Sequence, residues 1–233
     1  MIDWARLDQG IGDTAGQPAS SRIRQWLIAA IQDGQLQPGC RLKEVELVKS
    51  LDVSRTPLRE ALAGLRAEGI VDSDHDGLRV RRLDWRDIRA LYTYRGMLEG
   101  MAAKLAATHA HKAERRIIEQ LREEEADHIS RGVEAAVLAG HNRRFHHAIL
   151  QAAGNPFLAE GLERLSRLMV LLGKTAYSLG DRVEAIAGEH QMITAAIMTG
   201  DAGAAEAAMQ AHISNALEAR LTLLNMSGIG EMD

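Results

Sequence analysis

The sequence predicts a mainly α-helical protein, and three observations lead to this fold class. Apolar residues make up 46% of the 233 residues but aromatic residues only 3%, so aliphatic side chains must build the core. The chain has four prolines, and most apolar residues recur at helical spacing rather than in alternation. Its length allows one large or two small domains.

The first domain is expected over 20–83, after a flexible tail over 1–19. Ser54 is a suitable N-cap for a helix in which Pro57 occupies the first turn, where a missing N–H costs little. Turn residues and apolar spacing predict three helices and two extended segments, over about 20–33, 43–50, 55–68, 70–71 and 78–80. Three helices followed by a β-hairpin form a winged helix-turn-helix.

The second domain is expected over 84–226, followed by a flexible tail over 227–233. Gly180-Asp181 and Gly200-Asp201 each pair a helix-ending glycine with a capping aspartate. The helical period predicts an all-α bundle of about six helices, over 85–108, 112–131, 134–153, 156–178, 181–199 and 201–225.

Composition narrows the cellular setting. The single cysteine, Cys40, excludes an internal disulfide, and the N-terminus has no apolar signal region. No uninterrupted apolar run is long enough to span a membrane. We therefore expect a cytoplasmic protein without a membrane partner. The net charge is −4, but residues 20–82 hold 11 Lys and Arg against 9 Asp and Glu, so the first domain is slightly cationic.

The helix after Ser54 has features of a DNA-reading element. Arg55 and Arg59 are four residues apart and share one helix face. Arginine can bind guanine with two hydrogen bonds, and the hydroxyls of Ser54 and Thr56 suit phosphates. The alternative is that both arginines are solvated charges, paired with Asp52 or Glu60.

Two stretches of this region form a recognisable pattern, Gly34-Gln35-Leu36-Gln37-Pro38-Gly39 and Leu51-Asp52-Val53-Ser54-Arg55-Thr56-Pro57-Leu58-Arg59-Glu60-Ala61-Leu62. They resemble the DNA-binding domain of GntR-family regulators. The resemblance implies a homodimer that binds a palindromic operator in double-stranded DNA, with Arg55 and Arg59 reading bases and Ser54 and Thr56 contacting the backbone. It also implies a wing that enters the minor groove through His75 and Gly77. A departure is the acidic wing, which should repel phosphate through Asp72, Asp74 and Asp76.

Three histidines of the second domain stand apart from the others. His146, His190 and His212 each lie within a predicted helix, on or beside its apolar face. Asn142 is one helical turn before His146 and on the same side. Three imidazoles and one oxygen form a plausible ligand set for a divalent metal, whereas each histidine alone is more simply a hydrogen-bonded core residue. The acidic run 123–127 is expected to be a solvated face.

Residues 85–224 resemble the helical FCD ligand-binding domain of the FadR subgroup. The matching residues include 95–99, 142–146, Gly154-Asn155-Pro156 and Glu189-His190. The resemblance implies that zinc, nickel or manganese binds at Asn142, His146, His190 and His212, with Asn142 in place of the usual aspartate. It also places Arg95 at the pocket of a small organic-acid effector, with an ion pair to Glu99 as the alternative.

The resulting prediction is a transcriptional regulator of a metabolic operon, with repression as the expected mode, which a small carboxylate releases or repositions. A different class would be a metal-dependent hydrolase that uses the three histidines, with Glu189 as base. Adjacent helical residues point about 100° apart, so Glu189 faces away from His190. A DNA-architectural protein without an effector is a third possibility, and the large second domain argues against it.

Overall fold

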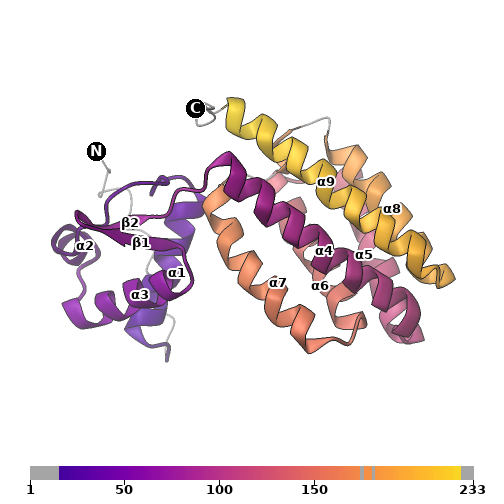
Figure 1. The fold of residues 1–233 in the computed structure, drawn as a ribbon, viewed down its shortest axis with the longest axis horizontal. Coiled ribbons are helices and arrows are strands. Elements are labelled where there is room, and N and C mark those ends of the chain that lie inside the picture. Colours follow the sequence, from indigo (N-terminus) through magenta and orange to yellow (C-terminus); the bar gives the residue numbers. More distant parts are fainter. Residues whose placement is uncertain (1–15, 174–175, 180–181, 227–233) are drawn as a thin grey trace. The chain divides into compact units, whose positions relative to one another are not determined.

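A computed structural model describes residues 16–173, 176–179 and 182–226 (Figure 1). The predicted tail 227–233 lies outside the described residues, and so do most of the tail 1–19 and the predicted capping pair Gly180-Asp181. Contacts divide the chain into two compact units. One comprises Met1–Asp84 and Ser166–Lys174, and the other comprises Trp85–Leu165 and Thr175–Asp233.

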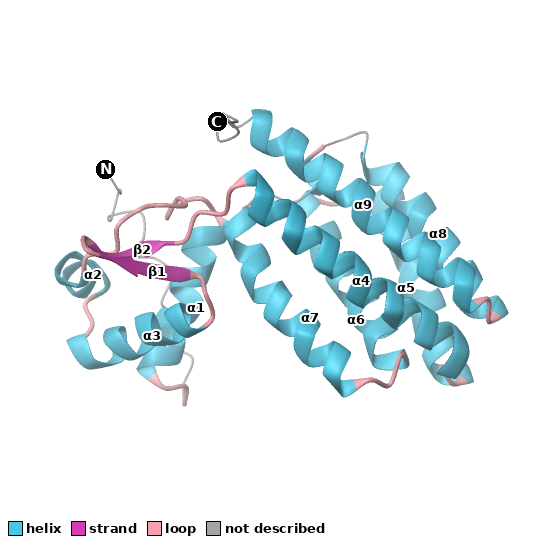
Figure 2. Cartoon of the chain, viewed as in Figure 1, coloured by secondary structure: helices cyan, strands magenta, loops and turns pink. Residues whose placement is uncertain are grey.

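The N-terminal unit is a winged helix-turn-helix, as the sequence predicted. Helix α3 packs against both α1 and α2, and the two strands pair in an antiparallel hairpin. Figure 2 shows this unit with its strands in magenta. Its elements are α1 Ala19–Gln32, α2 Glu44–Leu51, α3 Arg55–Ala67, β1 Val71–Asp74 and β2 Gly77–Val80.

A short turn sets α3 against α2. Asp52 ends α2 in the left-handed conformation, with a φ of 46°. Aspartate tolerates this conformation better than most residues, because its short polar side chain can bond locally. Leu47 and Leu51 of α2 and Leu58 and Leu62 of α3 are buried in one core. The turn therefore delivers the start of α3 to solvent while its apolar face stays covered.

The wing is anchored by a third extended segment. Arg41 forms an isolated antiparallel bridge with Arg79 of β2. The backbone N–H of Leu42 donates to the carbonyl of Leu78 at 2.8 Å, and that of Val80 donates to the carbonyl of Cys40 at 2.9 Å. Cys40 is half-buried against the core of this unit. The hairpin is thus held along the length of β2.

The predicted helix over 156–178 is wrong in its second half. Helix α7 is Pro156–Met169, followed by the 3-10 turns η2 Val170–Leu172 and η3 Ala176–Ser178. The chain turns at Gly173, whose φ is 67°. Glycine adopts this left-handed conformation without steric cost. Apolar spacing alone could not reveal the turn, because Leu171 is buried in the core of the N-terminal unit.

The C-terminal unit is the predicted bundle of about six helices, and α4 and α9 run side by side (Figure 1). A Cβ atom at Gly100 of α4 would lie 2.8 Å from the Gln210 side chain of α9, so a larger residue at this position would require that side chain to move. None of the helices in the described part of the chain is long and apolar enough to cross a bilayer. The helices besides α7 are α4 Trp85–His109, α5 Lys112–Ser130, α6 Ala135–Ala152, α8 Arg182–Thr199 and α9 Ala202–Met226.

Arg115 of α5 joins the ends of two other helices. Its guanidinium donates to the carbonyls of Ala107 at 2.8 Å, Ile197 at 2.7 Å and Met198 at 3.0 Å. Its Nε donates to the carbonyl of Ala110 at 3.1 Å. These carbonyls lie at the C-terminal ends of α4 and α8, where helices leave acceptors without partners inside the helix. One side chain therefore satisfies both helix ends and places them together.

Replacing Arg115 by methionine should lower the free energy of unfolding by about 2–3 kcal/mol, because charge-assisted hydrogen bonds are lost and partly buried carbonyls are left without donors. Urea unfolding followed by circular dichroism measures the change. The exposed neighbour Arg116 supplies the control, since Arg116→Met should shift the midpoint very little. Equal midpoints for the two variants would contradict the capping role.

Candidate functional site

Helix α3 presents one polar face to solvent. Its buried face is built from Leu58, Ala61, Leu62 and Leu65. Four of the six residues predicted to contact DNA lie at its start, and all four are exposed. Ser54 occupies the N-cap position, although its side chain makes no capping hydrogen bond. These exposed residues are Ser54, Arg55, Thr56 and Arg59.

Arg59 has a partner, but not one of those considered from the sequence. Its Nε donates to Glu44 of α2 at 3.3 Å, where the Arg59 side chain is 71% exposed and that of Glu44 is 37% exposed. An exposed ion pair of this kind contributes little free energy. The contact therefore leaves Arg59 available to a stronger acceptor, such as a base edge or a phosphate.

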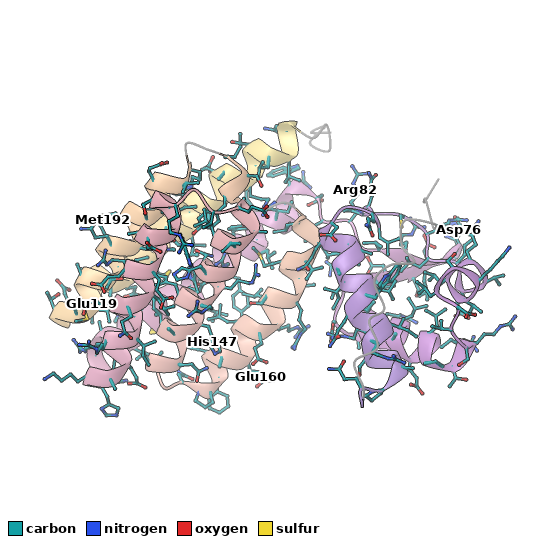
Figure 3. All side chains as sticks on the ribbon, turned by 180° about the vertical axis from the view of Figure 1, so that it is seen from behind. Asp76, Arg82, Glu119, His147, Glu160 and Met192 are labelled. Carbon is teal, nitrogen blue, oxygen red and sulfur yellow. The ribbon has the colours of Figure 1, made fainter. Side chains whose placement is uncertain are left out.

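The wing carries its acidic residues in ion pairs. Asp74 pairs with Arg79, and Asp76 pairs with Arg41. Asp76 lies at the tip of the N-terminal unit and is labelled in Figure 3. His75 between them is 88% exposed. The sequence-based expectation of repulsion between wing and phosphate is weakened, because two of the three aspartates are locally neutralised.

Gly77 follows this acidic tip and begins β2. Its φ of 114° lies in a region that residues with a Cβ rarely adopt. The glycine lets the chain turn back directly into the hairpin. The structure thus exposes both residues predicted for the wing contact, His75 and Gly77.

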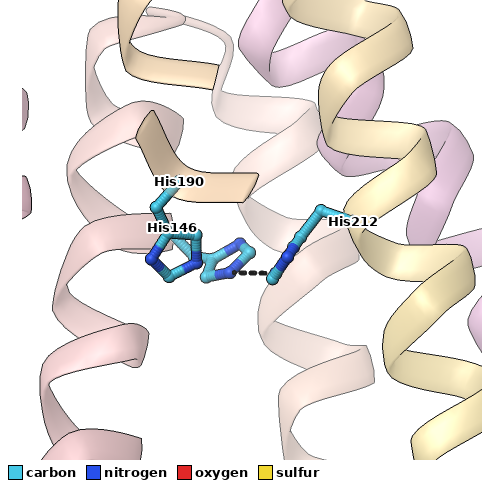
Figure 4. Close-up of side chains that lie close together, drawn as sticks. All are labelled: His146, His190 and His212. Carbon is cyan, nitrogen blue, oxygen red and sulfur yellow. Dashed lines mark hydrogen bonds between the residues drawn. The ribbon is translucent and has the colours of Figure 1, made fainter. Parts of the chain in front are cut away.

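The C-terminal unit brings His146, His190 and His212 together from α6, α8 and α9 (Figure 4). Their nearest ring nitrogens all lie within 4.8 Å of one another. Nε2 of His212 is 3.2 Å from Nε2 of His146. His190 is fully buried, and its Nε2 has no hydrogen-bond partner among the described residues. The neighbouring His147, which is labelled in Figure 3, is exposed by contrast.

Each of the three histidines bonds a buried glutamate through Nδ1. His146 pairs with Glu99, His190 with Glu125 at 2.8 Å, and His212 with Glu189 at 2.7 Å. A carboxylate at Nδ1 fixes the tautomer in which Nδ1 carries the proton and Nε2 carries a lone pair. Three lone pairs therefore converge, which is the arrangement that a metal ion requires of its ligands.

The charges of these pairs are set by burial and by neighbouring groups. Burial raises the pKa of Glu99, but the Arg95 charge and the contact with His146 outweigh it and hold this pKa well below its usual range. Burial also raises the pKa of Glu189, and hydrogen bonds from His212, Arg182 and Asn215 lower it to about 2.

The pKa values of two of the imidazoles are lowered as well, but here burial itself is the main cause. Burial lowers the pKa of His212 to about 3, against the opposing hydrogen bond to Glu189. Burial also lowers the pKa of His146. These two rings are therefore neutral at physiological pH, and metal binding at that pH does not have to displace a proton from them.

The donor set fits a divalent cation. Glu99, Glu125 and Glu189 contribute three negative charges, and Arg95 and Arg182 contribute two positive charges. Arg95 lies 2.5 Å from Glu99, and Arg182 donates to both oxygens of Glu189 at 2.7 and 2.8 Å. The cluster retains one negative charge, and two imidazole lone pairs face each other at 3.2 Å. A cation between the Nε2 atoms would compensate the remaining negative charge and remove the repulsion between the two lone pairs.

Asn142 and Arg95 have other partners in the structure. Oδ1 of Asn142 is 3.3 Å from the hydroxyl of Tyr177. The Arg95 guanidinium lies over the ring of Tyr92 as well as against Glu99. The ion pair that the sequence offered as an alternative for Arg95 is therefore present.

Sequence reasoning missed the glutamate partners. Glu125 was expected on a solvated face, but it is 2% exposed and bonds both His190 and Tyr177, so that expectation is wrong. Its place in the helical pattern carried a signal, since Ile118, Leu121 and Glu125 recur at the spacing of one buried face. Glu189 does turn away from His190, and it bonds His212 instead.

Comparison with known proteins gives matches over both units. A family model described as "Bacterial regulatory proteins, gntR family" matches residues 19–77, and the FCD domain model matches residues 90–215. The chain is 30% identical over 205 residues to a probable D-xylose utilization operon transcriptional repressor of Paenarthrobacter nicotinovorans, covering 86% of this chain and 88% of that protein.

Further similarities extend over the same regions. The chain is 30% identical to the HTH-type transcriptional regulator YdhC of Bacillus subtilis, covering 81% of this chain and 84% of that protein. A solved structure of E. coli McbR/YncC has a TM-score of 0.71 at 21% sequence identity and covers 90% of this chain and 100% of that one. At this identity, the likeness to the solved structure shows the fold alone.

Proposed function

Because the chain belongs to the GntR family of bacterial regulatory proteins and carries an FCD domain, we propose that it is a repressor of a metabolic operon, which a small carboxylate releases from DNA. The members of its family and its relatives are transcriptional regulators, and the chain is likewise a transcriptional regulator and not an enzyme. The D-xylose operon repressor among those relatives is named for control of a utilisation operon.

The DNA contact assigned to α3 rests on its exposed start. We assign base reading in the major groove to Arg55 and Arg59, and backbone contacts to Ser54 and Thr56. The wing, with His75 and Gly77, is assigned to the minor groove. Binding to a palindromic operator in double-stranded DNA requires two copies of α3, so the functional species is a homodimer.

The effector site is assigned to the three-histidine cluster and Arg95. A divalent metal such as zinc, nickel or manganese would be held by His146, His190 and His212, with Asn142 as a further oxygen ligand. Such an ion would act as a Lewis acid toward a carboxylate oxygen of the effector. The observation that carries this proposal is the set of three histidines that share one centre and are each oriented by a buried glutamate.

Arg95 links the effector to this centre. Its guanidinium is held by Glu99, and Glu99 also bonds His146. An effector carboxylate that binds Arg95 must compete with Glu99 for the guanidinium. It would thereby change the hydrogen bond between Glu99 and His146. This is a coupling between ligand and fold only when the effector binds the two arrangements with different affinity.

The hydrolase alternative is not supported. The matched families and relatives are transcriptional regulators, and both oxygens of Glu189 are held by Arg182, His212 and Asn215. A carboxylate held in this way is a poor candidate for a base. The FCD match over residues 90–215 also disfavours a purely architectural DNA protein.

A thermal-shift titration tests the effector assignment. Short mono- and dicarboxylic acids are added to full-length protein that is either metal-loaded or stripped with a chelator. An effector at 100 times its Kd should stabilise the loaded protein by about 2.7 kcal/mol. The same acid should release a DNA duplex selected by the protein from a random pool, and Arg95→Gln should weaken both responses.

Three results would reject the assignment. In the first, no acid shifts the midpoint of the loaded protein. In the second, the shift is equal in loaded and stripped protein, so that the metal has no part in binding. In the third, Arg95→Gln responds like the wild type. Methyl esters of the active acid serve as the matched control, because they keep the carbon skeleton and lose the charge.

A further inference from the structure

Tyr177 lies between two groups of the histidine centre, the cluster of His146, His190 and His212 with their glutamate partners. It belongs to the short turn η3 and is 6% exposed. Its hydroxyl oxygen is 3.1 Å from Oε1 of Glu125 and 3.3 Å from Oδ1 of Asn142. The other oxygen of Glu125 accepts from Nδ1 of His190 at 2.8 Å. One hydroxyl thus touches both the carboxylate that orients His190 and the amide proposed as an oxygen ligand.

A hydroxyl has one proton to give, and two acceptors face it. A carboxylate is the stronger acceptor, because the hydrogen bond is then charge-assisted. The hydroxyl oxygen is also closer to Glu125, at 3.1 Å, than to Asn142, at 3.3 Å. The hydroxyl therefore donates its proton to Glu125.

The amide of Asn142 must then meet the hydroxyl differently. With the proton donated to Glu125, an amide oxygen at 3.3 Å would oppose a phenolic oxygen without a proton between them. A half-turn of the amide exchanges its oxygen and nitrogen at almost no change of shape. Nδ2 then donates to the Tyr177 oxygen, and Oδ1 is released from this contact.

We propose that Tyr177 is a positioning residue of the histidine centre, which donates to Glu125 and accepts from Asn142, so that the Asn142 oxygen is left free to bind the metal. The proposal rests on the metal site assigned above. It gives a physical reason for asparagine at 142. An aspartate there would set a second carboxylate against a hydroxyl whose single proton is already donated to Glu125.

Cobalt binding to the full-length protein tests this role. The protein is stripped with a chelator and titrated with Co²⁺, and the visible absorption reports both affinity and coordination. Tyr177→Phe should weaken Co²⁺ binding about 10-fold, as expected for loss of a group that orients ligands. Tyr94→Phe supplies the matched control, since Tyr94 is exposed on α4, and it should bind within about twofold of the wild type.

A double-mutant cycle separates the two halves of the proposal. Asn142→Ala should weaken binding and change the Co²⁺ spectrum in the same direction as Tyr177→Phe. The double variant should lose little more than the stronger single variant, because Asn142→Ala removes the oxygen ligand and Tyr177→Phe removes the group that positions the same ligand. Asn142 is only partly buried, so its variant tests the contact even if Tyr177→Phe folds poorly.

Each contrary result has a distinct meaning. Wild-type affinity and spectrum in Tyr177→Phe would overturn the positioning role and leave the metal site standing. Fully additive losses in the double variant would overturn the link through Asn142. A wild-type chain that binds neither Co²⁺ nor Zn²⁺ would reject the metal site itself, and the role of Tyr177 with it.

Discussion

Replacing Arg55 and Arg59 together by alanine is expected to abolish specific operator binding. Each bidentate contact between arginine and guanine contributes about 1–3 kcal/mol of discrimination. The double variant should therefore bind its selected duplex roughly 30-fold to more than 1,000-fold more weakly. Each single variant should show a smaller loss of affinity. The duplex is selected by the wild-type protein from a random pool, and binding is measured by fluorescence anisotropy at fixed salt.

Arg66 provides the matched control on the same helix. It is exposed in the last turn of α3, at the opposite end from Arg55 and Arg59. Arg66→Ala removes the same charge from α3 but should retain sequence preference. Ser54→Ala should weaken binding to selected and random duplexes alike, since phosphate contacts carry no sequence information. A double arginine variant that binds its duplex within about threefold of the wild type would show that another element reads the bases.

The start of α3 could be predicted because its signals are local. Ser54 and Pro57 mark the first turn, and Leu58 and Leu62 lie at helical spacing. All of this information lies within one helix. The partner of Arg59 could not be predicted in the same way, because Glu44 is 15 residues away and reaches it only through the turn at Asp52.

The histidine centre shows more clearly the difference between signals that lie within one helix and contacts that join distant segments. The three histidines could be singled out because each interrupts an apolar helix face. The pairing of each histidine with its glutamate could not be predicted, since Glu99 and His146 are 47 residues apart and Glu125 and His190 are 65 apart. Such pairs depend on how helices cross, which periodicity within one helix does not specify. The aspartates of the wing illustrate the same limit, because their compensating arginines come from facing segments.

Removing one imidazole from the centre is the second large effect we expect. His190→Ala should weaken binding of a divalent metal by more than about 100-fold, the upper end of what loss of an orienting residue costs. The reason is that His190 is fully buried and its Nε2 has no partner among the described residues, so no neighbour replaces it as a donor. Metal content by mass spectrometry should fall from one ion per chain to near zero. Response to the effector acid should fall with it.

His147→Ala is the matched control, because His147 is exposed and adjacent to His146 in the sequence. It should keep the metal and the response.

Loss of His190 also leaves the buried carboxylate of Glu125 without its His190 donor, which destabilises the fold. His190→Gln therefore accompanies the alanine variant, since its amide can still donate to Glu125. Both variants should keep specific DNA binding, because α3 belongs to the other compact unit. Full metal content in His190→Gln, or an unchanged effector response without metal, would mean that the three Glu–His pairs hold the helices together rather than a cation.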